Sequence, residues 1–276
     1  MVFSSLTFLF LFFPLVMGVY YLCPRALRNL WLLLTSLLFY AWGEPVYIRL
    51  MAASILFNYL CGLGGAALQK REKKRLAKGL LILCIAGNIG ALGLFKYADL
   101  LIGTVNNIAG SKIALLELAL PIGISFYTFQ ALSYTIDVYQ HKIKPTHDIV
   151  AFFAFISFFP QLVAGPIERA TNLLPQFLVP RGFSYDKAVD GMRQILWGLF
   201  KKMVVADNCA AAVNLIFDEY QTLGGTHLFL GALFFTFQIY GDFSGYSDIA
   251  IGTARLFGVN LMRNFNFPYF SRDIAE

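Results

Sequence analysis

Residues 238–252, QIYGDFSGYSDIAIG, place polar and charged side chains between two apolar runs. The runs cover residues 228–239 and 249–259. A carboxylate inside a membrane-length apolar stretch costs about 2.5–3.5 kcal/mol at a helix centre, so such residues usually face a protein interior or a wet cavity. The stretch is therefore the first candidate for a functional site.

The spacing within this stretch allows two interpretations. Ser244, Asp248 and Arg255 would share one face of a continuous helix, which predicts an Asp248–Arg255 ion pair. Gly241 and Gly245 form a small-xxx-small pattern that permits close helix packing. A packed helix junction with a paired carboxylate therefore explains the pattern as well as a functional site does.

The composition indicates an integral membrane protein with several spans. Of the 276 residues, 58% are hydrophobic and 14% are charged, whereas soluble domains carry about 25% charged residues. The net charge of +6 fits cytoplasmic loops better than nucleic-acid binding, because the basic residues are not interleaved with aromatics on a polar face. The four cysteines form no CxxC or Cys/His cluster, so we expect neither a metal site nor a disulfide framework.

Apolar segments at residues 3–22, 30–42 (the shortest), 46–68 and 79–97 are predicted to span the bilayer. Between the last two lies the run KREKKRLAK at 70–78, which carries six basic residues and one acid. Such a run predicts a cytoplasmic loop, although it also suits contact with anionic lipid. The N-terminus would then lie outside.

Two later apolar segments are interrupted. Residues 113–139 contain Pro-Ile-Gly at 121–123, and residues 157–166 contain two prolines and a glycine. Proline inside a spanning helix removes a hydrogen bond, so we expect broken or re-entrant helices at both places. After the first break, four polar residues at helical spacing predict either interhelical hydrogen bonds or the wall of a wet path: Gln130, Ser133, Tyr134 and Asp137.

Residues 184–208 have the pattern of an amphipathic helix. One stripe is polar and the opposite face is apolar, which suits a helix at the membrane interface or beside a polar cavity. The polar stripe contains Lys187, Asp190, Gln194 and Lys201. The three histidines, His141, His147 and His227, lie in predicted loop or interfacial positions, and we expect none to act as a catalytic base.

Four motifs occur in a fixed order along the chain. They are PIGISFYTF at 121–129, FPQLVAGP at 159–166, DFSGYSD at 242–248 and NFNFPYFSR at 264–272. Together they resemble the membrane-bound O-acyltransferase (MBOAT) superfamily, in its bacterial alginate O-acetyltransferase-like branch. The resemblance extends from about residue 3 to residue 276.

The resemblance implies an all-α, multi-pass bundle in the bacterial inner membrane, forming one domain over residues 1–276. It implies transfer of an acetyl group from a thioester, acetyl-CoA or an acyl-carrier protein, to a cell-envelope polysaccharide such as alginate. An extracytoplasmic relay protein and the lipid bilayer are the implied partners; no bound cofactor, metal or nucleic acid is expected. The family's proposed base is a histidine, which we expect beyond Glu276, so this chain would lack the catalytic half and be inactive alone.

The residues expected to shape the acyl or acceptor channel all lie in or beside these motifs. They are Gln161, Gly165, Pro166, Glu168, Tyr240, Asp242, Ser244, Tyr246, Ser247 and Asp248. Three alternatives remain: D-alanyl transfer to teichoic acid, a membrane transporter, and a structural membrane subunit without catalysis.

Overall fold

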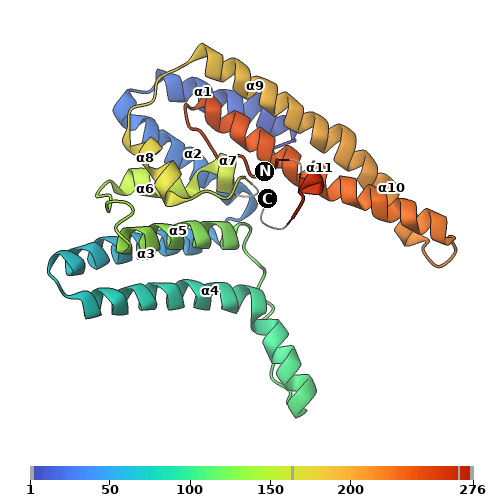
Figure 1. The fold of residues 1–276 in the computed structure, drawn as a ribbon, viewed down its shortest axis with the longest axis horizontal. Coiled ribbons are helices and arrows are strands. Elements are labelled where there is room, and N and C mark those ends of the chain that lie inside the picture. Colours follow the sequence, from blue (N-terminus) through green and yellow to red (C-terminus); the bar gives the residue numbers. More distant parts are fainter. Residues whose placement is uncertain (1–2, 163–164, 267, 274–276) are drawn as a thin grey trace. The chain divides into compact units, whose positions relative to one another are not determined.

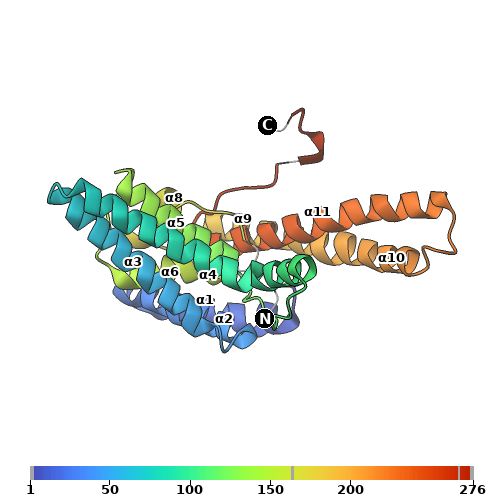
Figure 2. The same cartoon turned by 90° about the horizontal axis from the view of Figure 1, so that it is seen from below.

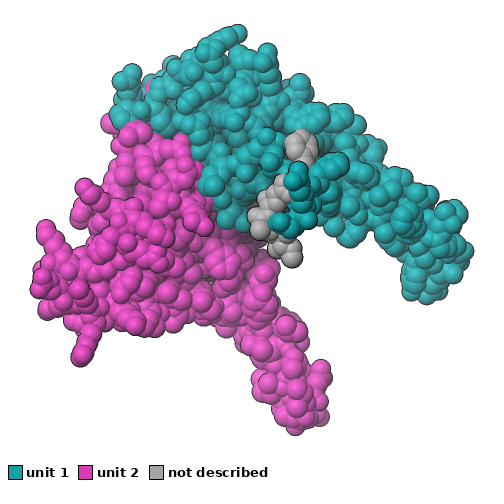
Figure 3. All heavy atoms as spheres, in the orientation of Figure 1, with its two compact units in different colours: residues 1–25, 164–167, 180–276 teal, residues 26–163, 168–179 magenta. Residues whose placement is uncertain are grey.

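The computed structural model describes residues 3–162, 165–266 and 268–273. Every regular element in these ranges is a helix, so the predicted all-α class is confirmed. Residues 163–164 and 267, which belong to two of the four motifs, lie outside the described residues. The chain divides into two compact units (Figure 3). The single membrane domain stays a prediction.

Unit 2 consists of Ala26–Val163 and Glu168–Val179. After a 3₁₀ turn, η2 (Arg25–Leu27), its helices are α2 (Arg28–Gly43), α3 (Ile48–Lys70), α4 (Lys74–Ala109), α5 (Ile124–Tyr139), α6 (Ile149–Ser157), α7 (Phe159–Leu162) and α8 (Ala170–Leu178). Helix α3 packs against both α4 and α5, and α6 packs against α2 and α8 (Figure 1).

Among the described residues, two helices, α3 and α4, are long and apolar enough to cross a bilayer. Both coincide with predicted spans, although α4 continues to Ala109, beyond the expected end at residue 97. No proline interrupts residues 98–109, and the helix ends where Gly110 takes a left-handed conformation with φ of 64°. The remaining predicted spans stay predictions.

Both predicted helix interruptions are confirmed as breaks in unit 2. Gly123 has φ of 74°, and a Cβ there would lie 2.7 Å from the carbonyl oxygen of Leu162. Only glycine fits this position without strain. Helix α5 begins directly after Gly123, at Ile124, and residues 110–120 form no helix. The second break falls at Phe158, whose ψ of 108° separates α6 from α7. A re-entrant path through a bilayer stays a prediction.

Unit 1 consists of Met1–Arg25, Ala164–Ile167 and Pro180–Glu276. Its elements are the π-helical η1 (Phe8–Phe12), α1 (Phe13–Leu22), α9 (Tyr185–Leu199), the π-helical η3 (Phe200–Ala206), α10 (Asp207–Asp218), α11 (Gly225–Leu256) and the 3₁₀ turn η4 (Pro268–Phe270). The consecutive α9, η3 and α10 run beside α11 and form a long helical hairpin with it (Figures 1 and 2). The stretch at 238–252 lies within α11.

Five glycines bring α9, η3 and α11 into backbone contact, and we call them the glycine seam: Gly191, Gly198, Gly241, Gly245 and Gly252. A Cβ on Gly198 would lie 2.6 Å from the carbonyl oxygen of Gly245, and one on Gly245 would lie 2.8 Å from that of Gly198. The close packing predicted from the small-xxx-small pattern is therefore confirmed.

Helix α1 is attached to the C-terminal end of α11 by tyrosine side chains. The Tyr20 hydroxyl donates to the carbonyl oxygen of Phe257 at 3.0 Å, and Tyr21 donates to that of Leu256. The Arg181 Nε in turn donates to the Tyr20 oxygen at 3.0 Å. These bonds link the N-terminal segment to the helix that carries the candidate site.

Candidate functional site

The carboxylate of Asp248 is the centre of the site in α11. Lys201 Nζ lies 2.7 Å from one of its oxygens, and Gln194 Nε2 donates to the other at 3.0 Å. The Asp248 and Lys201 side chains are only 13% and 16% exposed, so the ion pair is largely shielded from solvent. The predicted Asp248–Arg255 pair is wrong, because Arg255 pairs with Asp190 instead.

The ammonium of Lys201 also faces two aromatic rings. Its Nζ lies 5.7 Å from the ring centroid of Trp197 and 5.7 Å from that of Tyr240. Cations at this distance from a ring face are attracted by its quadrupole. Lys201 belongs to the π-helical η3, a kind of segment frequently found at functional sites. The lysine is thus held by a carboxylate and two rings at once.

Asp242 faces a second lysine, Lys202, which is also in η3. Lys202 Nζ lies 2.8 Å from Asp242 and 2.8 Å from Asp207, but these two carboxylates are 53% and 52% exposed. Exposed ion pairs contribute about 0–1 kcal/mol, so this cluster is a weaker feature than the shielded pair at Asp248.

Three other predicted channel residues of α11 have separate surroundings. The Tyr246 oxygen accepts a hydrogen bond from the Phe3 amide at 3.3 Å, and the two rings stack with centroids 4.9 Å apart. Ser244 and Ser247 are buried. The hydroxyl of Ser244 has no hydrogen-bond partner among the described residues.

Two cavities in unit 1 lie against the Lys201–Asp248 pair. The first, which we call the aromatic cavity, has a volume of about 340 Å³, and its walls include Trp197, Phe200, Lys201, Phe237, Tyr240 and Tyr269. The second, which we call the arginine pocket, has a volume of about 370 Å³ and is lined by Arg193, Arg255, Arg263, Gln194, Asp190 and Asp248. Trp197 and Arg263 belong to both walls, and none of the three histidines lines either cavity.

The other four predicted channel residues lie near the motif at 159–166. In unit 2, Gln161 accepts a hydrogen bond from Gln130 at 3.1 Å, and Glu168 accepts one from Asn172 at 2.7 Å. Gly165 and Pro166, in unit 1, are buried in a segment without regular structure. Because these residues divide between the two units, their joint channel role stays a prediction.

The polar stripe on α5 forms hydrogen bonds between helices and loops of unit 2. Besides Gln161, the amide of Gln130 donates to the carbonyl oxygen of Phe155 at 3.1 Å. The Tyr134 oxygen accepts the Thr146 amide at 3.2 Å, and Asp137 lies 3.8 Å from Lys142. Of the two interpretations of this stripe, interhelical hydrogen bonding is confirmed.

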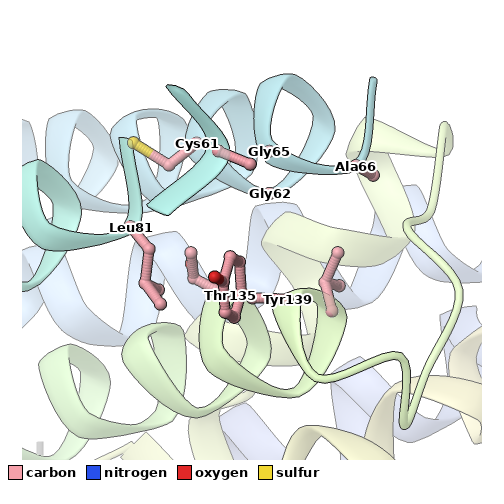
Figure 4. Close-up of a pocket in the computed structure, with 9 residues that line it drawn as sticks. Cys61, Gly62, Gly65, Ala66, Leu81, Thr135 and Tyr139 are labelled. Carbon is pink, nitrogen blue, oxygen red and sulfur yellow. The ribbon is translucent and has the colours of Figure 1, made fainter. Parts of the chain in front are cut away.

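A buried polar cluster joins α3, α4 and α5. Asn58 donates to Asn88 at 2.9 Å and accepts from it at 3.1 Å, and the Cys84 thiol also contacts Asn58 at 3.3 Å. A small cavity of about 10 Å³, at the lower limit for holding one water molecule, lies nearby beside Cys61 and Thr135 (Figure 4). The cluster has satisfied hydrogen bonds and suits helix packing rather than ligand binding.

The two residues that bond to Asp248, Lys201 and Gln194, are not evident as its partners from the sequence. Both belong to the polar stripe of residues 184–208, but no local pattern connects that stripe to Asp248. The seven-residue spacing of Gly191 and Gly198, matched by Gly245 and Gly252, was the available signal that the two helices meet. Asp190 and Gln194 of that stripe line the arginine pocket, and a position of the helix at the membrane interface stays a prediction.

Comparisons with known proteins agree with the motifs. No protein-family model matches the chain. The protein named "Probable alginate O-acetylase AlgI" from Pseudomonas aeruginosa is 43% identical over the whole chain, which covers 53% of that relative. The "Peptidoglycan O-acetyltransferase" of Helicobacter pylori is 34% identical, again over the whole chain and 58% of the relative. The "Teichoic acid D-alanyltransferase" of Bacillus subtilis is 24% identical over 56% of the chain and 40% of the relative.

The helical fold, the ordered motifs and these identities define a relative of membrane-bound O-acyltransferases. Within that superfamily, the chain is a homologue of the alginate O-acetylases, with 42–43% identity over its whole length to two of them. It spans about half the length of the relatives that it matches.

Proposed function

We propose that this chain forms part of a membrane-bound O-acetyltransferase that esterifies hydroxyl groups of a cell-envelope polysaccharide such as alginate. The observation that carries the proposal is the 43% identity to an alginate O-acetylase over all of the chain. The 34% identity to a peptidoglycan O-acetyltransferase supports the same reaction on a related acceptor.

In this proposal, the donor is an acyl thioester, either acetyl-CoA or an acyl-carrier protein. The acceptor oxygen attacks the thioester carbonyl, the thiolate leaves, and a base takes the hydroxyl proton. The acceptor is the polysaccharide itself or an extracytoplasmic protein that relays the acetyl group. None of the three histidines, His141, His147 and His227, is proposed as this base, because none of them lines either cavity of unit 1.

The proposed location is the bacterial inner membrane, with several spans. The support is the pair of long apolar helices α3 and α4, joined by the basic run at 70–78. Large apolar side chains are also exposed along α11, including Phe229, Phe235 and Ile239, as is suitable for a helix in lipid. Topology reporters fused after residue 72 should report the cytoplasm; an outside location would contradict this orientation.

Within the site, the Lys201–Asp248 pair is proposed to hold η3 and α11 in register beside the aromatic cavity. A shielded ion pair with both carboxylate oxygens bonded fixes the position of its partners, because breaking it leaves an uncompensated charge. The aromatic cavity would then accommodate the uncharged part of a substrate.

The function is tested by deleting the chromosomal gene and measuring acetyl esters on the envelope polysaccharide. We expect the ester content to fall on deletion and to return when the intact gene is restored. Ester-linked D-alanine, measured in the same samples, should not change. An unchanged acetyl content would refute the proposal, and loss of D-alanine alone would favour the teichoic acid alternative.

A further inference from the structure

The two carboxylates of the arginine pocket already have partners. Asp190 pairs with Arg255. Asp248 is bonded by Lys201 on one oxygen and by Gln194 on the other. Neither carboxylate is therefore left to neutralise another cation in the pocket.

Two further arginines line the same pocket without an acidic partner. Among the described residues, neither Arg193 nor Arg263 forms an ion pair. Arg263 donates its Nε to the carbonyl oxygen of Phe265 at 3.1 Å, which fixes its guanidinium but leaves the terminal N–H groups available. The pocket thus contains two guanidinium groups whose positive charge is not balanced within it.

Both arginine side chains are exposed, so water and salt screen their mutual repulsion, but both would attract an anion bound in the pocket. A guanidinium matches the oxygens of a phosphate in a forked, two-bond geometry. The volume of about 370 Å³ exceeds the needs of a lone phosphate and falls within the range of sites for larger ligands. A phosphate that is part of a longer molecule is the ligand that best fits.

The neighbouring aromatic cavity indicates what the rest of that molecule is like. It shares Trp197 and Arg263 with the arginine pocket, and its other walls are mainly aromatic and aliphatic. A ligand that occupies both cavities therefore has a phosphorylated end and a long, less polar arm. The phosphopantetheine group that carries acyl thioesters has this construction.

Building on the proposed function, we infer that Arg193 and Arg263 bind the phosphate of a phosphopantetheine thioester, the acyl donor. The pantetheine arm then extends past Trp197 into the aromatic cavity. A phospholipid offers the same combination of phosphate and apolar arm, so the experiment separates these two sources.

The test compares 4′-phosphopantetheine with pantetheine, which differ by one phosphate. Both are titrated by calorimetry against the full gene product, purified in phosphatidylcholine nanodiscs. Arg193→Gln and Arg263→Gln should each weaken 4′-phosphopantetheine binding about ten- to a hundredfold, because each removes a charge-assisted bond. Pantetheine should bind all variants equally. Arg49→Gln, which alters an exposed arginine that lines neither cavity, is the matched control and should bind like the wild type.

Arg193→Lys keeps the charge and should recover part of the affinity, which separates charge from misfolding. The inference is overturned if the glutamine variants bind 4′-phosphopantetheine normally, or if they lose pantetheine binding to the same extent. It is also overturned if phosphatidylglycerol in the nanodisc, rather than 4′-phosphopantetheine, shows the arginine dependence. If gene deletion removes acetyl esters but these variants bind normally, only this inference fails; if deletion leaves the esters unchanged, the proposed function fails.

Discussion

Substituting Gly198 with alanine should separate α9 from α11. The added Cβ would lie 2.6 Å from the carbonyl oxygen of Gly245 and 2.8 Å from both the amide nitrogen and the Cγ1 of Ile249. Ordinary contact begins near 3.4 Å, and two of these three atoms belong to a helix backbone that cannot rotate away. The helices must therefore move apart, and the clash cannot be relieved by a change of rotamer.

The expected magnitude follows from two opposing effects. Overpacking typically costs about 1–3 kcal/mol, and the backbone contacts place Gly198→Ala near the upper end. Replacing a helical glycine with alanine returns up to about 1 kcal/mol of helix propensity. The net loss should be about 2 kcal/mol. Gly93→Ala in α4 is the matched control, because a Cβ there meets nothing within 4 Å; it should be neutral or slightly stabilising.

The assay is thermal unfolding of the purified protein in one detergent, followed by tryptophan fluorescence. A loss of about 2 kcal/mol should lower the Tm of Gly198→Ala by about 4–8 °C relative to the wild type. Gly93→Ala should not fall below the wild type. If Gly198→Ala unfolds at or above the temperature of Gly93→Ala, the backbone contact between α9 and α11 is wrong.

Three further substitutions test single interactions by the same thermal assay. Asp248→Asn should cost about 3–5 kcal/mol because it leaves the shielded Lys201 without its counter-charge, and adding Lys201→Met should recover much of that loss; no recovery would contradict the pairing. Asn58→Ala should cost about 1–3 kcal/mol by leaving Asn88 unsatisfied, and a neutral result would contradict the buried cluster. Asp148 accepts the Ala151 amide at 2.9 Å as the N-cap of α6, so Asp148→Ala should cost about 1 kcal/mol while Asp148→Asn should cost little.

Much of the fold could be predicted from local sequence signals. Proline and left-handed glycine signals lie at the breaks before α5 and after α6, because proline removes a helix hydrogen bond and a left-handed residue leaves the helical conformation. The long apolar segments place α3 and α4. The apolar span was expected to end at residue 97, whereas α4 continues as a helix to Ala109, because polar side chains such as Asp99 do not by themselves end a helix.

The composition of the site was harder to predict because it depends on tertiary contacts. Tyr240 and Asp248, both selected from the sequence as channel residues, contact the same lysine, Lys201, which lies 47 residues from Asp248 in the chain. Their channel role stays a prediction. The partner of Lys201 could be identified only once the packing of α9, η3 and α11 was known.

The contrast between the predicted and the observed partner of Asp248 has a geometric cause. Asp248 and Arg255 share a helix face, but seven residues separate them by about 10 Å along the axis, which is far for an ion pair. The glycine seam brings η3 within backbone contact of α11, so Lys201 reaches the same carboxylate at 2.7 Å. Because η3 lies this close to α11, a residue of η3 can reach Asp248 more easily than Arg255 of α11 can. The seam therefore determines which cation Asp248 binds, and Arg255 remains free to pair with Asp190 at the edge of the arginine pocket.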